Sequence, residues 1–149
     1  MTERGEPIGS IDHVAIVVRS IAASLPRYRA LFGLEPEGEV IELAAQRARL
    51  LFLPTGPWPA ARLELVEPTD ADSGVGRFLA VRGEGLHHVC FRSADLPRDL
   101  ARLAAAEADL IDAAPRPGAH GDVAFLHPRT LNGVLWELAA ANEEVPPDA

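Results

Sequence analysis

The chain has 149 residues, of which 48% are hydrophobic and 24% are charged, and this is the size and composition of one globular domain rather than of a disordered or membrane protein. Its net charge of -8 would repel phosphate groups, which argues against nucleic acid or an anionic membrane as the main partner. All 14 basic residues are Arg, so chemistry that needs a lysine amine is excluded.

The N-terminus and the cysteine content indicate a reducing compartment. Residues 1–7 are polar and include acidic residues, where a signal peptide would have a basic and then an apolar region. Cys90 is the only cysteine, so no intrachain disulfide can form. No apolar run approaches the roughly 18 residues of a membrane span. We therefore expect a cytoplasmic protein.

The first half of the chain predicts the element order β, α, β, β, β. A strand over residues 10–18 opens this unit, because alternate positions form two consistent faces. A helix follows over about residues 21–31, with Pro26 suited to its first turn and Gly33 to its C-terminal end. Three strands complete the unit, near residues 37–43, 47–53 and 62–66.

The second half repeats this order after a connecting helix at about residues 74–81, which the polar residues before it can cap. A strand over 86–92 and a helix over about 97–106 open the repeat. Three strands close it, near residues 109–111, 123–126 and 134–138. We expect one domain over residues 1–149, with module one at about 10–68, a linker helix at 69–84, module two at about 85–139 and a frayed tail at 140–149.

Individual residues repeat together with the elements. His13 in the opening strand of module one matches His88 in module two, a shift of 75 residues, and Glu64 matches Glu137 in the closing strands, a shift of 73. A His or Glu inside an apolar strand is costly unless a partner satisfies it. Taken alone, His13 and Glu64 would more often be structural. Together, the four residues form a sensible ligand set for a metal ion.

The predicted ligands, His13, Glu64, His88 and Glu137, favour one divalent ion of Co, Mn, Ni, Fe or Zn over Ca or Mg, because imidazole prefers the first group. Structural zinc sites more often use cysteines. Four ligands would leave two adjacent octahedral positions for water or a bidentate substrate. We therefore expect an open, catalytic metal site.

Paired βαβββ modules with ligands from four strands resemble the vicinal oxygen chelate superfamily, which includes glyoxalase I, extradiol dioxygenases and methylmalonyl-CoA epimerases. Over residues 10–139 the chain resembles the epimerases. The matching segments are IDHVAIVV at 11–18, LELVEPT at 63–69, DSGVGRFLAVRGEGLHHVCF at 72–91, PRPGAHGDVAFLHPR at 115–129 and GVLWEL at 133–138. The resemblance implies an α+β fold in which a half-barrel-like mixed sheet surrounds the metal site.

The resemblance also implies a metal-dependent reaction, the interconversion of (R)- and (S)-methylmalonyl-CoA by a 1,1-proton transfer at C2. The family's ligands fall on the same four residues, and its proton-transferring glutamate falls on Glu137. Some members carry a second glutamate where our alignment places Arg49, and Arg cannot act as a base at neutral pH. Either Glu64 serves the second face of the enolate, which we favour, or Arg49 contacts the substrate carboxylate while a metal-bound water or Glu67 moves the proton.

Other basic residues are candidates for contact with the substrate. These are Arg49, Arg116, His120 and Arg129, although solvated surface positions are the commoner outcome for such arginines. His87 should face away from His88, because adjacent strand residues point to opposite faces. The implied partners are an acyl-CoA substrate and a second copy of the chain, since dimers are usual among relatives.

Three other functions on the same fold stay open. They are a glyoxalase-I-like lactoylglutathione lyase, an epimerase of another acyl-CoA, and a metal-free small-molecule-binding protein. The complete ligand quartet argues against the metal-free protein. An extradiol dioxygenase is disfavoured, because that chemistry uses two His and one carboxylate around Fe(II) and a fourth ligand would block a position.

Overall fold

The computed structural model describes residues 5–141, so the predicted tail lies outside the described residues from position 142 onward. Eight strands form one sheet in the order β2-β3-β4-β1-β5-β8-β7-β6. The strands are β1 (Ile11–Val17), β2 (Glu37–Leu43), β3 (Ala48–Pro54), β4 (Arg62–Pro68), β5 (Gly85–Ser93), β6 (Arg116–Gly118), β7 (Gly121–Leu126) and β8 (Leu135–Ala140). The helices are α1 (Ile21–Phe32), α2 (Gly74–Arg82) and α3 (Leu96–Ala105), and two 3-10 turns span Ala44–Gln46 and Pro128–Thr130.

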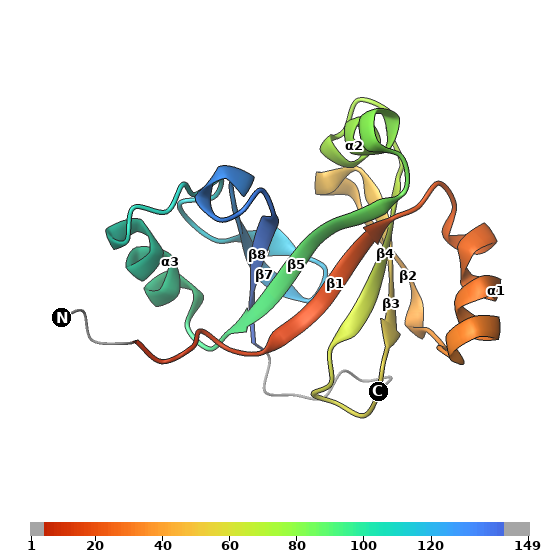
Figure 1. The fold of residues 1–149 in the computed structure, drawn as a ribbon, viewed down its shortest axis with the longest axis horizontal. Coiled ribbons are helices and arrows are strands. Elements are labelled where there is room, and N and C mark those ends of the chain that lie inside the picture. The colour runs from red at the N-terminus through yellow and green to blue at the C-terminus, as the bar shows by residue number, and fades with distance from the viewer. Residues whose placement is uncertain (1–4, 142–149) are drawn as a thin grey trace.

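The centre of the sheet joins the opening strands of the two halves of the chain. β1 runs antiparallel to β5, while β4 lies parallel to β1 and β8 lies parallel to β5. Figure 1 shows β1 and β5 side by side across the middle of the molecule, with α1 and α3 at opposite ends. The predicted α+β fold with a mixed half-barrel sheet is confirmed.

The helices begin at capping side chains. Ser20 caps α1 by accepting a hydrogen bond from the Ala23 backbone N–H, and Gly33 ends that helix with a positive φ of 65°. The sequence had suggested that Pro26 belongs to the first turn of this helix. In the structure α1 begins at Ile21, so Pro26 lies inside the helix. Ser73 and Asp95 cap α2 and α3 in the same way as Ser20 caps α1.

One predicted strand is absent from its expected place. Residues 109–111 form only an isolated bridge between Leu110 and Leu126, and the short strand of this region is β6, which pairs with β7 in a hairpin. The Asp112 carboxylate accepts a hydrogen bond from the Phe125 backbone N–H. A side chain thus replaces the backbone acceptor for the Phe125 N–H, while the Phe125 carbonyl accepts from the backbone N–H groups of Ile111 and Asp112.

Helices α1 and α3 each cover one half of the sheet through a separate apolar cluster. Ile21 of α1 packs with Leu51, Leu53 and Leu65 of the sheet, and α3 contributes to a second cluster with β7 and β8 through Leu96, Leu100, Ala124, Leu126 and Leu138. None of the helices in the described part of the chain is long and apolar enough to cross a membrane.

Replacing Leu65 with Ala should lower the free energy of unfolding by about 2–5 kcal/mol, because truncation of a fully buried leucine loses apolar contacts and leaves a cavity. Urea unfolding followed by circular dichroism measures this loss. Val81→Ala is the control, since the Val81 side chain is 83% exposed. Equal costs for the two substitutions would contradict the packing of α1 on this face.

Candidate metal centre

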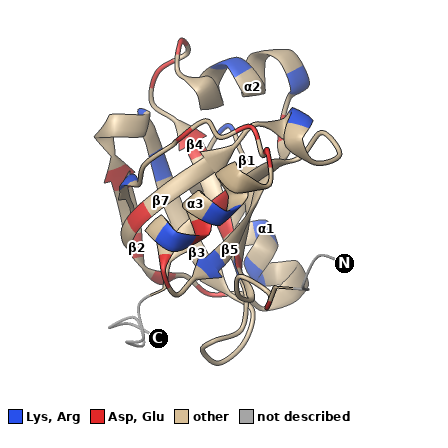
Figure 2. Ribbon diagram, turned by 90° about the vertical axis from the view of Figure 1, so that its left-hand side faces the viewer, with Lys and Arg blue, Asp and Glu red and all other residues tan. Residues whose placement is uncertain are grey.

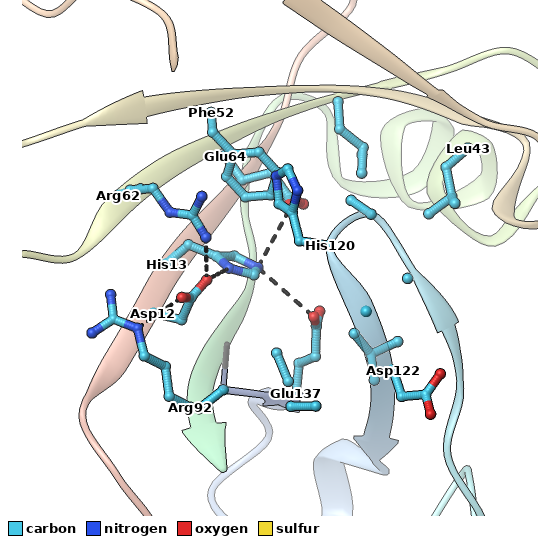
Figure 3. A pocket seen from close by; sticks show the side chains of 18 of the residues that line it. Asp12, His13, Leu43, Phe52, Arg62, Glu64, Arg92, His120, Asp122 and Glu137 are labelled. Atoms are coloured by element: carbon cyan, nitrogen blue, oxygen red, sulfur yellow. Dashed lines mark hydrogen bonds and ion pairs between the residues drawn. The ribbon is translucent and has the colours of Figure 1, made fainter. Parts of the chain in front are cut away.

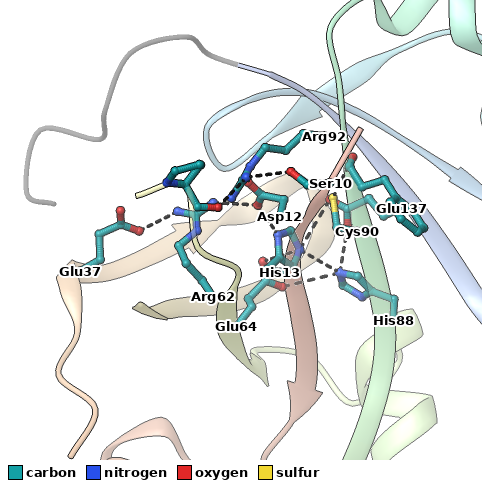
Figure 4. A network of polar contacts seen from close by, with 12 residues as sticks. Ser10, Asp12, His13, Glu37, Arg62, Glu64, His88, Cys90, Arg92 and Glu137 are labelled. Atoms are coloured by element: carbon teal, nitrogen blue, oxygen red, sulfur yellow. Dashed lines mark hydrogen bonds and ion pairs between the residues drawn. The ribbon is translucent and has the colours of Figure 1, made fainter. Parts of the chain in front are cut away.

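Four polar side chains meet at the middle of the sheet, one from each of its four central strands (Figure 4). His13 Nε2 lies 3.3 Å from His88 Nε2 and 3.3 Å from Glu64 Oε2. His88 Nε2 lies 2.8 Å from Glu137 Oε2. All four residues are buried. The four residues that the internal repeat selected are therefore together in space.

The strand register explains why the four residues meet. Glu64 on β4 is paired with Ala15, two residues after His13 on β1. Glu137 on β8 is paired in the same way with Cys90, two residues after His88 on β5. Each half of the chain thus contributes one histidine and one glutamate with the same relative placement, as a pseudo-twofold axis between β1 and β5 requires.

The charges of the cluster favour a bound cation. Burial alone would lower the pKa of His13, but the carboxylates of Glu64 and Glu137 and the hydrogen bond to Asp12 outweigh it and raise that pKa to about 9. Burial also raises the pKa of Glu64. A proton on His13 thus offsets only part of the negative charge of the two carboxylates, and a divalent cation would offset it in full.

The donor atoms also fit a first-row divalent ion. Ligands at about 2.1 Å from such an ion lie roughly 3.0–3.4 Å from one another, and the His–His and His–Glu donor pairs here are 2.8–3.9 Å apart. His13, Glu64 and His88 offer ligand atoms that all lie within 4.8 Å of one another. Asp12, His13 and Cys90 form a second such group, but burial raises the pKa of the Cys90 thiol, and only the thiolate is a good ligand.

The four residues line a pocket with a volume of about 190 Å³, and Figure 3 labels three of them, His13, Glu64 and Glu137. Its walls include Leu50 and Phe52 from β3 and residues 118–123 at the turn between β6 and β7. This volume is below the roughly 300–1,000 Å³ of pockets for drug-sized ligands. The pocket therefore suits a small acyl group better than a whole coenzyme.

Of the four residues predicted to contact the substrate, only His120 lines this pocket, where its ring packs on Phe52 at 5.0 Å between centroids. Arg49 points away from the pocket, because Leu50 and Phe52 take the inward positions of β3, and its guanidinium pairs with Glu67. Arg116 and Arg129 are exposed outside the pocket and pair with Asp112 and Asp109.

Charged residues of the sheet itself hydrogen-bond to His13 or to its partner, and the sequence analysis had missed them. Figure 2 shows that acidic and basic residues, in red and blue, occur on the strands. The Asp12 carboxylate accepts hydrogen bonds from His13 Nδ1 at 2.6 Å, from Arg62 at 2.7 Å and from Arg92 at 2.9 Å. Arg62 also donates to Glu37 at 2.6 Å. The signal available in the sequence was the presence of Arg at two inward strand positions, where an unpaired charge would be costly.

His87 also departs from the prediction. Its ring packs edge-on against Phe78 of α2, with 4.9 Å between centroids, but its Nδ1 lies only 2.8 Å from Nδ1 of His88. Burial and the neighbouring His88 lower the pKa of His87 to about 4. His87 is thus a neutral neighbour of the candidate metal centre rather than a residue turned away from it.

The sequence of the chain matches a known protein family. The sequence model described as the Glyoxalase/Bleomycin resistance protein/Dioxygenase superfamily matches residues 12–125. The chain belongs to this superfamily. The match begins one residue before His13 and ends within β7, so it includes three of the four residues of the centre.

Within the glyoxalase superfamily, several relatives align over most of the chain. An uncharacterised protein of Bacillus subtilis is 40% identical over 86% of this chain and 89% of its own. The ethylmalonyl-CoA/methylmalonyl-CoA epimerase of Cereibacter sphaeroides is 34% identical over 88% of this chain and 97% of its own. A Streptomyces coelicolor methylmalonyl-CoA epimerase variant, solved with 2-nitronate-propionyl-CoA, superimposes with a TM-score of 0.83 at 35% identity and covers 91% of this chain and 99% of that chain.

Proposed function

We propose that the protein is a methylmalonyl-CoA epimerase, which interconverts (R)- and (S)-methylmalonyl-CoA through a proton transfer at C2. The observation that carries this proposal is the buried quartet of His13, Glu64, His88 and Glu137 in the lining of a small pocket. The identity with the Cereibacter sphaeroides epimerase over nearly its whole length supports it. A divalent ion bound by the quartet would act as a Lewis acid and stabilise the negative charge of the enolate.

We assign the two glutamates to the two faces of the substrate carbon. Glu64 comes from β4 and Glu137 from β8, the strands on either side of the β1–β5 pair. In Figure 3 their carboxylates lie on opposite sides of the His13 imidazole tip, at 3.3 Å and 3.9 Å from Nε2. Glu137 removes the C2 proton from one face, and Glu64 in its acid form returns a proton to the other face. The roles exchange in the reverse direction.

The rest of the substrate extends beyond the pocket. We assign the acyl end to the pocket, with His120 in contact with it, because His120 stands in the wall formed by the turn between β6 and β7. We assign Arg116 and Arg129 to the phosphates of the coenzyme, since both guanidinium groups are exposed. The proposal includes one ion of Co, Mn, Ni or Zn, a homodimer and a cytoplasmic location.

Deuterium exchange tests this function directly. The protein is purified, its bound metal is measured, and it is incubated with methylmalonyl-CoA in deuterated water. We expect deuterium at C2, a loss of this exchange with EDTA, and recovery when Co²⁺ is added back. Ethylmalonyl-CoA is the second substrate, since the Cereibacter sphaeroides relative is named for both. Absence of exchange with every malonyl-CoA analogue would overturn the proposal, and turnover of the glutathione hemithioacetal of methylglyoxal would favour the lyase.

A further inference from the structure

The two central strands each contain one bulge, and the two bulges occupy equivalent positions. Between Ile11 and His13, β1 advances by two residues while β5 advances by one, from Phe91 to Cys90, so Asp12 is the extra residue. Between Ala15 and Ile16 the opposite occurs, because β5 goes from His88 to Leu86 and His87 is extra. Asp12 and His87 thus each directly precede a histidine of the centre.

These bulges explain how neighbouring residues on a strand can touch. In a regular strand, successive side chains point to opposite faces. A bulge changes the direction of one side chain and is common next to active sites. Here the bulged residue reaches Nδ1 of the following histidine in both strands, at 2.6 Å from Asp12 to His13 and at 2.8 Å from His87 to His88.

The equivalent positions hold chemically different partners. The Asp12 carboxylate can only accept, so Nδ1 of His13 donates to it and Nε2 keeps the lone pair that a ligand needs. Arg62 and Arg92 hold Asp12 in place from β4 and β5, with side chains only 6% and 9% exposed. Asp12 is therefore a fixed, negatively charged acceptor.

The partner of His88 carries no negative charge. If Nε2 of His88 binds a metal, its Nδ1 must carry the proton and donate the hydrogen bond. His87 can accept this hydrogen bond only through an unprotonated Nδ1. An imidazole acceptor is therefore neutral. The outer hydrogen bond of a metal-bound histidine sets its basicity as a ligand, and a carboxylate raises it.

We infer that the two histidines of the centre are unequal ligands: Asp12, fixed by Arg62 and Arg92, makes His13 the stronger donor, while His87 leaves His88 the weaker one. This inference rests on the proposed metal site. Asp12, Arg62, Arg92 and His87 are positioning residues in this scheme, because they act on the centre through the two histidines. The four ligands are related by the pseudo-twofold axis, but the hydrogen-bond partners of the two histidines are chemically different.

Titration of the metal-free protein with Co²⁺ tests the inference without any enzyme assay. Asp12→Asn should weaken the affinity for Co²⁺ by about 10–100-fold, the usual cost of losing an outer partner, whereas His87→Asn should change it by less than about threefold. Glu42→Gln is the control for the loss of a carboxylate, because the Glu42 side chain is 67% exposed and lies outside the pocket. Equal losses for Asp12→Asn and His87→Asn would overturn the inference.

A second substitution keeps the test decisive if Asp12→Asn does not fold. His87→Asp gives His88 the same kind of partner that Asp12 gives His13, at the equivalent bulge. We expect it to tighten Co²⁺ binding about tenfold. Leu86→Asp adds the same charge at a neighbouring position that is 67% exposed and should not tighten it comparably. No gain for His87→Asp over Leu86→Asp would overturn the inference.

The outcomes separate this inference from the proposed function. If the unaltered protein binds no Co²⁺, the metal site itself fails and the inference fails with it. If the protein binds Co²⁺ and exchanges the C2 proton, but Asp12 and His87 substitutions have equal effects, only the inequality of the two histidines is wrong.

Discussion

Replacing Glu137 with Gln is expected to slow C2 proton exchange in methylmalonyl-CoA by about 10²–10⁴-fold, the range associated with a positioned general base. The carboxamide keeps the size of the side chain and an oxygen that can still bind a cation, but it cannot accept the proton. Glu137 is buried beside His88, so few water molecules can take over this role. Deuterium incorporation at C2, measured by mass spectrometry with each epimer, gives the rate.

Two further measurements make this result specific. Co²⁺ titration should show that Glu137→Gln retains metal binding, so that the loss of exchange reflects proton transfer. Glu42→Gln is the matched control, since it is an exposed glutamate on β2. Full activity of Glu64→Gln would rule out our assignment of Glu64 to the second face, and full activity of Glu137→Gln would rule out the assignment of Glu137 to the first.

Arg62→Met should lower the free energy of unfolding by about 3–5 kcal/mol, the typical cost of leaving buried charges without their partner. The Arg62 guanidinium donates to both Asp12 and Glu37, and both carboxylates are at least nine-tenths buried. Without Arg62, Glu37 would lose its guanidinium partner in a low-dielectric interior, and Asp12 would keep only Arg92 and His13.

Arg49→Met is the matched control, because it removes the same group from the opposite face of the neighbouring strand. The Arg49 side chain is 48% exposed in its pair with Glu67, and exposed ion pairs contribute up to about 1 kcal/mol. Urea unfolding of both variants with EDTA present removes any contribution from metal binding. Similar midpoints for the two variants would contradict the burial of the Arg62 network.

Much of the fold could be predicted because local signals and the repeat agreed. The strand at Glu37–Leu43 was predicted with its observed bounds, and the histidine and glutamate pairs were found through their shifts along the chain. Such a repeat carries long-range information that a single strand lacks. It placed four residues near one another without any knowledge of the sheet order.

The support of the centre could not be predicted in the same way. A strand pattern assumes that side chains alternate between two faces. The bulge at Asp12 breaks this alternation through a register shift that the neighbouring residues do not predict. The link between Asp12, Arg62 and Arg92 joins residues up to 80 positions apart. Arg49 was expected to contact the substrate, but Leu50 and Phe52 take the pocket-facing positions of β3 and the Arg49 guanidinium pairs with Glu67 outside the pocket.

The antiparallel contact of β1 with β5 has a consequence for how the protein assembles. Neither half of the chain contains all four proposed ligands, because the boundary between the halves runs between His13 and His88. A chain cut in the connecting segment at residues 69–84 would yield two fragments that bind metal well only after they associate. Metal uptake would then report directly on fragment complementation, because an ion bound by ligands from both fragments would stabilise their complex.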